Sequence, residues 1–329
     1  MSFFANFVQR ALVQGIPLLF GSTGEILTEK SGNLNLGIPG IMYVGGISGV
    51  MGAFFYEQSL SSPDAINGFL AIMIPLLCSL LGAGLVSLIY AFLTITLRAN
   101  QNVTGLAITT FGVGFGNFFG GSLAKLAGSE TASLSVRATS AYFRASIMGV
   151  DSGWFGQIFL SYGFLAYTAI IVAVVVTVIL RRTRLGLHLR AVGENPATAD
   201  AAGINVGAYK YGATVLGGAI AGLGGLYYVM DYMGGIWSNN GFGDRGWLAI
   251  ALVIFALWNP SYGILGSFIF GGLYILPMII PGLSRSMVEF FATFPYLVTI
   301  IVLVVTSMRK KRETQPPASL GLSYFREER

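Results

Sequence analysis

The chain has 329 residues, of which 54% are apolar and only 10% are charged, and its mean hydropathy is +0.72. An average soluble domain has about 25% charged residues, so this chain lacks the polar atoms that a water-facing surface needs. The composition excludes a soluble globular protein and indicates a polytopic membrane protein. A single cysteine, Cys78, excludes an intrachain disulfide, and a single histidine, His188, excludes a multi-histidine metal site.

Runs without a charged residue recur along the whole chain and predict membrane-spanning helices. A helix needs about 20 apolar residues to cross a hydrocarbon core of about 30 Å, and lipid offers no hydrogen-bond partner to an open sheet edge. The 39-residue run 246–284 is long enough for two spans, broken near Trp258, Asn259 and Pro260. We therefore predict an all-α fold with about nine spans, near residues 8–28, 37–57, 69–97, 101–121, 157–180, 207–230, 245–258, 261–280 and 290–308.

The distribution of basic residues predicts the orientation of the chain. Nine spans place the two termini on opposite sides of the membrane. With the C-terminus inside, 13 of the 19 Lys and Arg residues fall on the cytoplasmic side, as the positive-inside rule requires. The segment 122–156 is then an external loop and the segment 181–206 a cytoplasmic loop. The basic tail 309–329 is predicted to be cytoplasmic, and to be disordered beyond Gln315.

The order of the spans predicts two inverted repeats within one transmembrane domain, residues 1–308. The first repeat covers about 8–121, the second about 207–308, and the span near 157–180 connects them. A stretch rich in Gly and Asn breaks each repeat, at 32–40 and at 239–246. In transporters, paired helix breaks of this kind flank a site between the repeats near the middle of the bilayer.

Many of the 45 glycines are expected to serve helix packing, because small residues four apart let helix backbones approach closely in lipid. The clearest set is Gly112, Gly116 and Gly120, and Gly45 with Gly49 and Gly218 with Gly222 have the same spacing.

The cytoplasmic loop 181–206 contains the signals of a short helix with defined ends. Asn195 is a good N-cap, and Pro196 fits the first helical position, where its missing N–H costs nothing. The residues that follow, up to Ala202, are mostly strong helix formers, and Gly203 suits the left-handed position after a helix. An isolated helix of two turns is marginal in water, so we expect another surface to pack on it.

Three motifs resemble one family of transport proteins. Gly186–Val206 is similar to the cytoplasmic coupling loop of ABC importer permeases of the branched-chain amino acid/ribose type. Thr28–Gly37, followed by Gly40-Ile41-Met42, resembles the signature of the nucleoside-uptake branch, and Gln101–Ala107 resembles the opening of the family's fourth span. The resemblance covers about residues 10–308. In departure from it, Pro39 stands where related permeases often carry Glu.

The resemblance implies a type II importer-like permease of the bacterial inner membrane that moves nucleosides, or a related sugar-containing solute, by alternating access. It implies cytoplasmic ATPase subunits, a second and different permease chain, and an external substrate-binding lipoprotein, with no nucleic acid. The chain has no Gly-x-x-x-x-Gly-Lys-Ser/Thr phosphate loop, so we expect no enzyme activity and no cofactor in it, with ATP and Mg bound by the partners. The coupling residues would be Glu194, Asn195, Pro196, Ala197, Thr198, Ala199, Asp200, Ala201, Ala202 and Gly203.

A nucleoside offers a flat base and a hydroxylated sugar, which aromatic faces and amide or hydroxyl groups would bind. Side chains of these types gather at the two breaks and in the fourth span. The candidates for the substrate pathway are Asn33, Asn35, Asn102, Thr104, Thr109, Phe111, Phe115, Asn117, Asn239, Asn240, Phe242 and Trp247. Phe111 and Phe115, with the nearby Phe118, could equally face lipid or the core. Asp244 and Arg245 are candidates for the outer mouth, or for a simple interfacial role.

The main alternative is an ion-coupled secondary transporter of a small polar solute. That mechanism would need a carboxylate or a histidine deep in a span with a partner, and Glu25 is the one group that the predicted spans place there. A channel would not need a capped cytoplasmic helix, and a membrane enzyme would need more acid–base or metal-binding side chains.

Overall fold

The computed structural model describes residues 3–60, 62, 65–128, 133–146, 156, 158–280, 282–309 and 315–326. The long helices are α1 (Phe3–Glu29), α2 (Ile38–Gln58), α3 (Gly68–Ala91), α4 (Gln101–Leu126), α7 (Phe164–Arg182), α10 (Val206–Tyr227), α12 (Pro260–Ile279) and α14 (Phe294–Arg309). The shorter ones are α5 (Arg137–Arg144), α8 (Arg184–Glu194), α9 (Pro196–Ala201), α11 (Arg245–Phe255) and α13 (Arg285–Ala292). The π-helical turns η2 (Phe92–Thr96) and η3 (Tyr228–Tyr232) extend α3 and α10.

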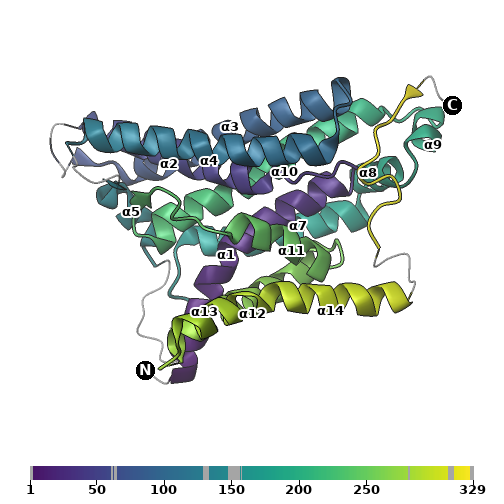
Figure 1. Cartoon of the computed structure of the whole chain (residues 1–329). Helices are drawn as coiled ribbons and strands as arrows, with labels where there is room; N and C mark the ends of the chain where they lie inside the picture. Colours follow the sequence, from purple (N-terminus) through teal and green to yellow (C-terminus); the bar gives the residue numbers. More distant parts are fainter. Residues whose placement is uncertain are drawn as a thin grey trace.

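The helices form two groups with α1 between them (Figure 1). On one side α2, α3, α4 and α10 run side by side, and on the other lie α12, α13 and α14. Helices α2 and α10 are the most deeply buried of the apolar helices, whereas α3, α4 and α14 expose long apolar faces. We call the end of the bundle that carries α9 the α9 end, and the end that carries the small sheet the β end.

Within the described residues, seven helical segments are long and apolar enough to cross a membrane, which agrees with the predicted polytopic protein. They are Ile38–Gln58, Gly68–Thr96, Gln101–Leu126, Phe164–Arg182, Val206–Tyr232, Pro260–Ile279 and Arg285–Val305. The predicted span 245–258 is wrong as a full crossing. Helix α11 has 11 residues, or about 16 Å at 1.5 Å per residue, half of the hydrocarbon thickness.

Helix α1 differs from the other long helices in its polarity. Its 27 residues would reach about 40 Å, but it carries charged and amide side chains along its length and is not among the seven apolar segments. It is nevertheless buried, between α10 and α12. The predicted break near Trp258 is confirmed. Leu257 and Trp258 have positive φ, and the Asn259 side chain caps α12 by accepting from the Ser261 N–H.

Glycines at the predicted spacing bring the helices of the first group together. A Cβ on Gly112 of α4 would lie 2.4 Å from the Gly40 carbonyl oxygen of α2, and a Cβ on Gly45 of α2 would lie 2.4 Å from the Gly222 Cα of α10. No larger side chain fits at these crossings without moving a backbone. The predicted packing role is therefore confirmed for these positions, whereas Gly114, on the exposed side of α4, has open space around it.

The region predicted as the external loop 122–156 contains regular structure where it is described. Helix α4 extends to Leu126, and β1 (Ser133–Ser135) and α5 lie within the predicted loop. Strand β1 pairs antiparallel with β2 (Ile236–Ser238), with Leu134 opposite Trp237. This small sheet is a departure from the all-α prediction. It joins the end of α4 to the segment after α10.

Buried polar groups hold the break between α1 and α2. The Leu34 N–H donates to Gln101 Oε1 at 2.7 Å, and the Asn35 N–H donates to Glu25 Oε1 at 2.9 Å. The Asn35 side chain accepts from the Gly37 N–H at 2.9 Å and thereby leads into α2. Unpaired backbone groups are costly away from water, so these bonds allow a non-helical segment inside the bundle.

Candidate functional site

Helix α9 has the ends that the sequence predicted. The Asn195 side chain accepts from the Thr198 N–H at 3.0 Å, Pro196 is the first helical residue, and Gly203 follows the helix with φ of +83°. Because these are local contacts within nine residues, they follow from the capping preferences of the residues alone.

One side of α9 is fixed to the bundle and the other is exposed. Ala199 is buried in a small apolar cluster with Val192 of α8 and Val206 of α10. Asp200 is half-buried. The exposed residues of the predicted coupling set are Glu194, Asn195, Thr198, Ala201, Ala202 and Gly203. This arrangement presents a rigid, small-residue surface on which another protein could dock.

Helix α8, which precedes α9, was not predicted from the sequence. The Thr183 side chain caps it by accepting from the Gly186 N–H at 3.2 Å, and His188 Nδ1 is 2.8 Å from the Tyr209 hydroxyl of α10. The residue that could have indicated α8 is Thr183, a favourable N-cap residue near the start of the predicted loop. Glu194, predicted as part of the coupling helix, is the last residue of α8.

Residues 315–326 of the tail have a defined course, so the predicted disorder beyond Gln315 is wrong for this segment (Figure 1). The Ser319 side chain and N–H both donate to the Gly193 carbonyl of α8, at 2.6 and 3.0 Å. Further along, the Tyr324 hydroxyl donates to Asp200 Oδ2 of α9 at 2.8 Å, and Arg326 Nε lies 3.2 Å from the same oxygen. The tail therefore contacts both short helices of the α9 end (Figure 1).

A cavity of about 640 Å³ also opens at the α9 end, beside the last residue of α8. Lys30, Arg181, Arg190 and Glu194 are among its lining residues. Burial lowers the pKa of Lys30 from its ordinary value, and the nearby Glu194 carboxylate opposes this shift. The described lining of this cavity thus combines basic groups with the acidic Glu194.

At the β end, two predicted pathway residues from distant parts of the chain bond to each other. Asn117 Nδ2 of α4 donates to Asn240 Oδ1 at 2.9 Å. Tyr43 of α2 completes the group, since its hydroxyl donates to Asn117 Oδ1 at 2.7 Å and accepts from the Asn240 N–H at 2.8 Å. Tyr43 was not predicted, because the sequence around it does not distinguish it from an aromatic residue that only fills space between helices.

Aromatic rings continue this group toward the start of α11. The Tyr43 ring centroid lies 5.1 Å from that of Trp237 and 6.3 Å from that of Phe242, another predicted pathway residue. Phe242 in turn lies 5.1 Å from Tyr228 of η3. We call Tyr43, Asn117, Trp237, Asn240 and Phe242 the amide–aromatic cluster. It combines the ring faces and amide groups that suit a flat, polar, uncharged solute.

Arg245, predicted at the outer mouth, is buried at the first turn of α11. Its guanidinium carbon lies 4.5, 5.5 and 4.9 Å from the ring centroids of Tyr228, Tyr232 and Tyr274. The guanidinium also donates to the Phe242 carbonyl at 2.8 Å. Rings and a carbonyl thus compensate the buried charge. The neighbouring Asp244 is exposed, and within the described residues the two side chains form no ion pair.

Two other predicted pathway residues stabilise the break between α1 and α2. Asn33 Nδ2 lies 3.3 Å from both Thr94 Oγ1 and Thr214 Oγ1, and the Thr109 hydroxyl donates to the Leu36 carbonyl at 2.7 Å. Asn35 lies in the same break. Of the remaining candidates, Asn102, Phe111 and Asn239 are exposed, and Thr104, Phe115 and Trp247 are buried or half-buried. The structure therefore distributes the twelve candidates over several places, with Asn117, Asn240 and Phe242 brought together.

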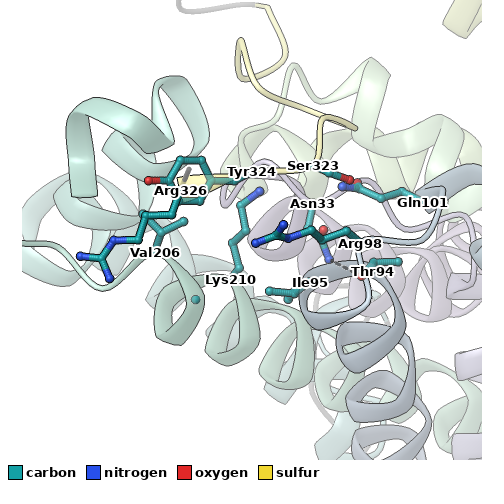
Figure 2. Close-up of a pocket in the computed structure, with 11 residues that line it drawn as sticks. Asn33, Thr94, Ile95, Arg98, Gln101, Val206, Lys210, Ser323, Tyr324 and Arg326 are labelled. Atoms are coloured by element: carbon teal, nitrogen blue, oxygen red, sulfur yellow. Dashed lines mark hydrogen bonds between the residues drawn. The ribbon is translucent and has the colours of Figure 1, made fainter. Parts of the chain in front are cut away.

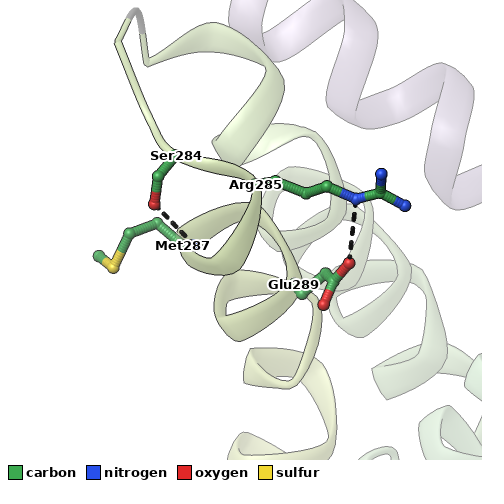
Figure 3. A network of polar contacts seen from close by, with 4 residues as sticks. All are labelled: Ser284, Arg285, Met287 and Glu289. Atoms are coloured by element: carbon green, nitrogen blue, oxygen red, sulfur yellow. Dashed lines mark hydrogen bonds and ion pairs between the residues drawn. The ribbon is translucent and has the colours of Figure 1, made fainter.

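Charged residues at the start of α13 remain exposed. Arg285 Nε lies 3.4 Å from Glu289 Oε1, one helical turn further on, and the Ser284 hydroxyl accepts from the Met287 N–H (Figure 3). More than two thirds of each charged side chain is exposed. Glu289 lies in the apolar segment Arg285–Val305, one residue before the predicted span 290–308.

Two carboxylates are buried near the end of α1. Glu25 is fully buried and accepts from the Asn35 N–H, and Glu29 accepts from Trp258 Nε1 next to the α11–α12 break. In the described part of the chain, no group of three or more His, Cys, Asp or Glu side chains could hold a metal ion.

Comparison with known proteins places this architecture in a transport family. Residues 7–304 match the family described as the permease component of the branched-chain amino acid transport system. The chain is 32% identical to the nucleoside ABC transporter permease protein NupC of Lactococcus lactis, over 91% of both chains. It is 30% identical to the guanosine ABC transporter permease protein NupQ of Bacillus subtilis, over 90% of both.

The chain also matches a relative whose name gives a different solute. The chain is 29% identical, over 99% of both chains, to the putative glucose ABC transporter permease protein TsgC13 of Haloferax volcanii. The family match covers the first six apolar segments and the seventh up to residue 304, and it includes the break between α1 and α2 and the α8–α9 segment. The chain therefore belongs to the permease family of the branched-chain amino acid transport system.

Proposed function

We propose that the chain is a permease subunit of an ABC importer and that it carries nucleosides into the cell. The single observation that supports this most strongly is α9, an exposed helix capped at both ends and rooted in the bundle through Ala199. In a permease of this family, an exposed helix of this kind offers a surface on which a separate ATPase subunit can dock.

Nucleosides are the proposed cargo because of two independent indications. NupC and NupQ, each at least 30% identical to the chain, are named for nucleosides and for guanosine. The amide–aromatic cluster offers ring faces beside amide groups, which suit a base and a sugar. A sugar remains the rival cargo, since TsgC13 is named for glucose.

The proposed assembly contains cytoplasmic ATPase subunits, a second permease chain and an external substrate-binding lipoprotein in a bacterial inner membrane. The α9 end faces the cytoplasm together with the C-terminal tail, and the β end faces outward. The two inverted repeats place the pathway at their interface. The region from β1 to α5 forms part of the surface that receives the binding protein.

In the proposed mechanism, ATP-driven movement of the ATPases displaces α9. Helix α8 follows directly on α7, and Gly203 to Asn205 lead directly into α10, so the displacement reaches two long helices of the bundle. Helix α10 packs against α1, α2 and α3, and through these contacts its movement changes access to the pathway. This coupling requires two states of the permease that the ATPases bind with different affinity.

The test is uptake by proteoliposomes that contain the permease with its ATPases, second permease and binding protein. Uptake of labelled guanosine should stop without ATP, persist when the proton gradient is collapsed, and exceed uptake of labelled glucose. Uptake that continues without ATP would reject the importer. ATP-driven uptake of glucose but not guanosine would reject only the cargo.

The second candidate function is an ion-coupled transporter, favoured by the buried Glu25 and Glu29. Both carboxylates, however, accept hydrogen bonds from groups that hold helix breaks, Asn35 N–H and Trp258 Nε1. These bonds give the pair a structural role. In the same proteoliposomes, a gradient-driven transporter would lose uptake on collapse of the proton gradient.

A further inference from the structure

A cavity of about 150 Å³ lies at the α9 end between the tail and the membrane helices (Figure 2). Its lining includes Asn33 from the α1–α2 break, Arg98 from the η2–α4 connection, and Lys210 from α10. Tyr324 and Arg326 of the tail close another side. The described lining has three basic side chains and no acidic one.

Lys210 is the most unusual of these groups. Its side chain is 3% exposed, and within the described residues it has no hydrogen-bond or ion-pair partner. Figure 2 shows that it extends into the cavity toward the tail, with the Arg98 guanidinium pointing toward it. Burial of most of the Lys210 side chain removes part of the hydration of its ammonium group, and a bound anion would replace it.

Arg98 adds a second positive charge, and the described residues supply no counter-ion for it. It adopts φ of +58°, which is strained for a side chain with a Cβ, and its guanidinium lies 4.5 Å from the Phe325 ring centroid of the tail. Arg326, by contrast, is paired with Asp200. Among the described residues, the cavity therefore carries two positive charges, on Arg98 and Lys210, that no carboxylate pairs with.

We propose that this cavity binds a phosphate-type oxoanion, either free phosphate or the phosphate of a larger molecule. The planar fork of Arg98 suits two oxygens of such a group, and the Lys210 ammonium acts as a point charge on a third. A cavity of about 150 Å³ holds a benzene-sized molecule, so it has room for one phosphate group but not for a nucleotide.

The bound anion would join the tail to the membrane helices. Tyr324 and Arg326 line the cavity and also contact Asp200 of α9. An oxoanion there attracts Arg326 and neutralises Arg98 and Lys210, so it stabilises the position of the tail over α9. The site thus links anion binding to the helix on which the proposed coupling rests.

The test measures the thermal unfolding of the full chain in neutral-lipid nanodiscs during titration with inorganic phosphate at constant ionic strength. We expect saturable stabilisation. Lys210→Met and Arg98→Gln should each weaken the phosphate Kd at least tenfold, and Lys210→Met should also raise the Tm without phosphate, because it removes a charged group from a buried position. Arg181→Gln, which removes a charge from the neighbouring 640 Å³ cavity, should keep the Kd within twofold.

Three results would overturn the proposal: no saturable stabilisation of the unaltered chain, equal weakening in Arg181→Gln, or unchanged Kd values in both Lys210→Met and Arg98→Gln. A variant that ends at Arg326 should also keep the Kd. If phosphate binds only to that variant, the chain's own last residues occupy the site and the proposal fails.

A second experiment distinguishes a lipid headgroup from a soluble anion as the source of the phosphate group. Nanodiscs that contain phosphatidic acid, without added phosphate, should stabilise the chain in a Lys210-dependent way if a lipid headgroup reaches the site. Stabilisation by inorganic phosphate but not by phosphatidic acid would identify a soluble anion. None of these measurements depends on transport, so their failure leaves the proposed importer untouched.

Discussion

The two ends of the molecule hold their polar groups together in different ways. At the α9 end, α9 is defined by contacts within nine residues, from the Asn195 cap to Gly203. At the β end, the hydrogen bonds join Tyr43, Asn117 and Asn240, which are up to 197 residues apart in the chain. The proposed docking surface is therefore formed by residues that are close in the sequence. The proposed substrate surface exists only after the helices of the bundle have packed together.

If α9 is a docking surface, the largest effect should come from filling its exposed side. Thr198→Trp adds bulk at an exposed position whose side chain makes no cap hydrogen bond, because the cap uses the Thr198 N–H. Docking should lose at least about 2 kcal/mol, which corresponds to about 30-fold in affinity. Co-purification with the ATPases and ATP-driven uptake measure this loss.

The matched control is Thr198→Ser, which should bind the ATPases normally. The Tm of Thr198→Trp should equal that of the unaltered permease. Full retention of the ATPases by the Trp variant would show that α9 is not the docking surface.

At the β end, Asn117→Ala should reduce guanosine uptake by about tenfold. The substitution leaves the Tyr43 hydroxyl without its acceptor and removes the bond to Asn240, and such a loss costs about 1–3 kcal/mol. Uptake kinetics at saturating binding protein measure the effect. Asn102→Ala, at an exposed position of the same helix, should change uptake less than twofold. Equal effects of the two variants would contradict a pathway role for the cluster.

Removal of residues 315–329 should have a smaller effect, confined to the α9 end. It eliminates the Ser319, Tyr324 and Arg326 contacts to α8 and α9. The exposed Arg326 pair contributes about 0.2–1 kcal/mol and the Tyr324 bond somewhat more, so we expect about a threefold rise in ATP hydrolysed per guanosine imported. Hydrogen exchange should become faster in α9. Unchanged exchange there would mean that the tail does not hold the helix.

The smallest effect is expected for Arg285→Gln in α13. The ion pair with Glu289 is solvent-exposed, and a helical pair of this kind contributes about 0.3–0.5 kcal/mol (Figure 3). Thermal unfolding and uptake should both be nearly unchanged. A loss of uptake above tenfold would show that α13 belongs to a third functional surface, separate from the α9 end and from the amide–aromatic cluster.

Much of the fold could be predicted from the sequence because apolar length and helix caps are local properties. The break at Trp258, the packing role of Gly112 and the ends of α9 all follow from such patterns, whereas Gly40 as the partner of Gly112 does not. The shortness of α11 does not, because its apolar run continues through the break into α12.

The candidate site could be predicted only in part. Asn117 and Asn240 are recognisable as polar groups near breaks, but their hydrogen bond and the participation of Tyr43 depend on how α2 and α4 cross. The ordered tail was missed for the same reason. Its composition is polar and basic, and its partners, Gly193 and Asp200, lie more than 100 residues away.

The proposed docking of an ATPase on α9 is tested most directly by measuring which end of the molecule faces the cytoplasm. In a Cys78→Ser background, Thr198→Cys and Asn239→Cys each place one exposed thiol, at the α9 end and near the amide–aromatic cluster respectively. With a membrane-impermeant maleimide on right-side-out vesicles, Asn239→Cys should be labelled at once and Thr198→Cys only after permeabilisation. Labelling of Thr198→Cys in intact vesicles would contradict an ATPase docking on α9.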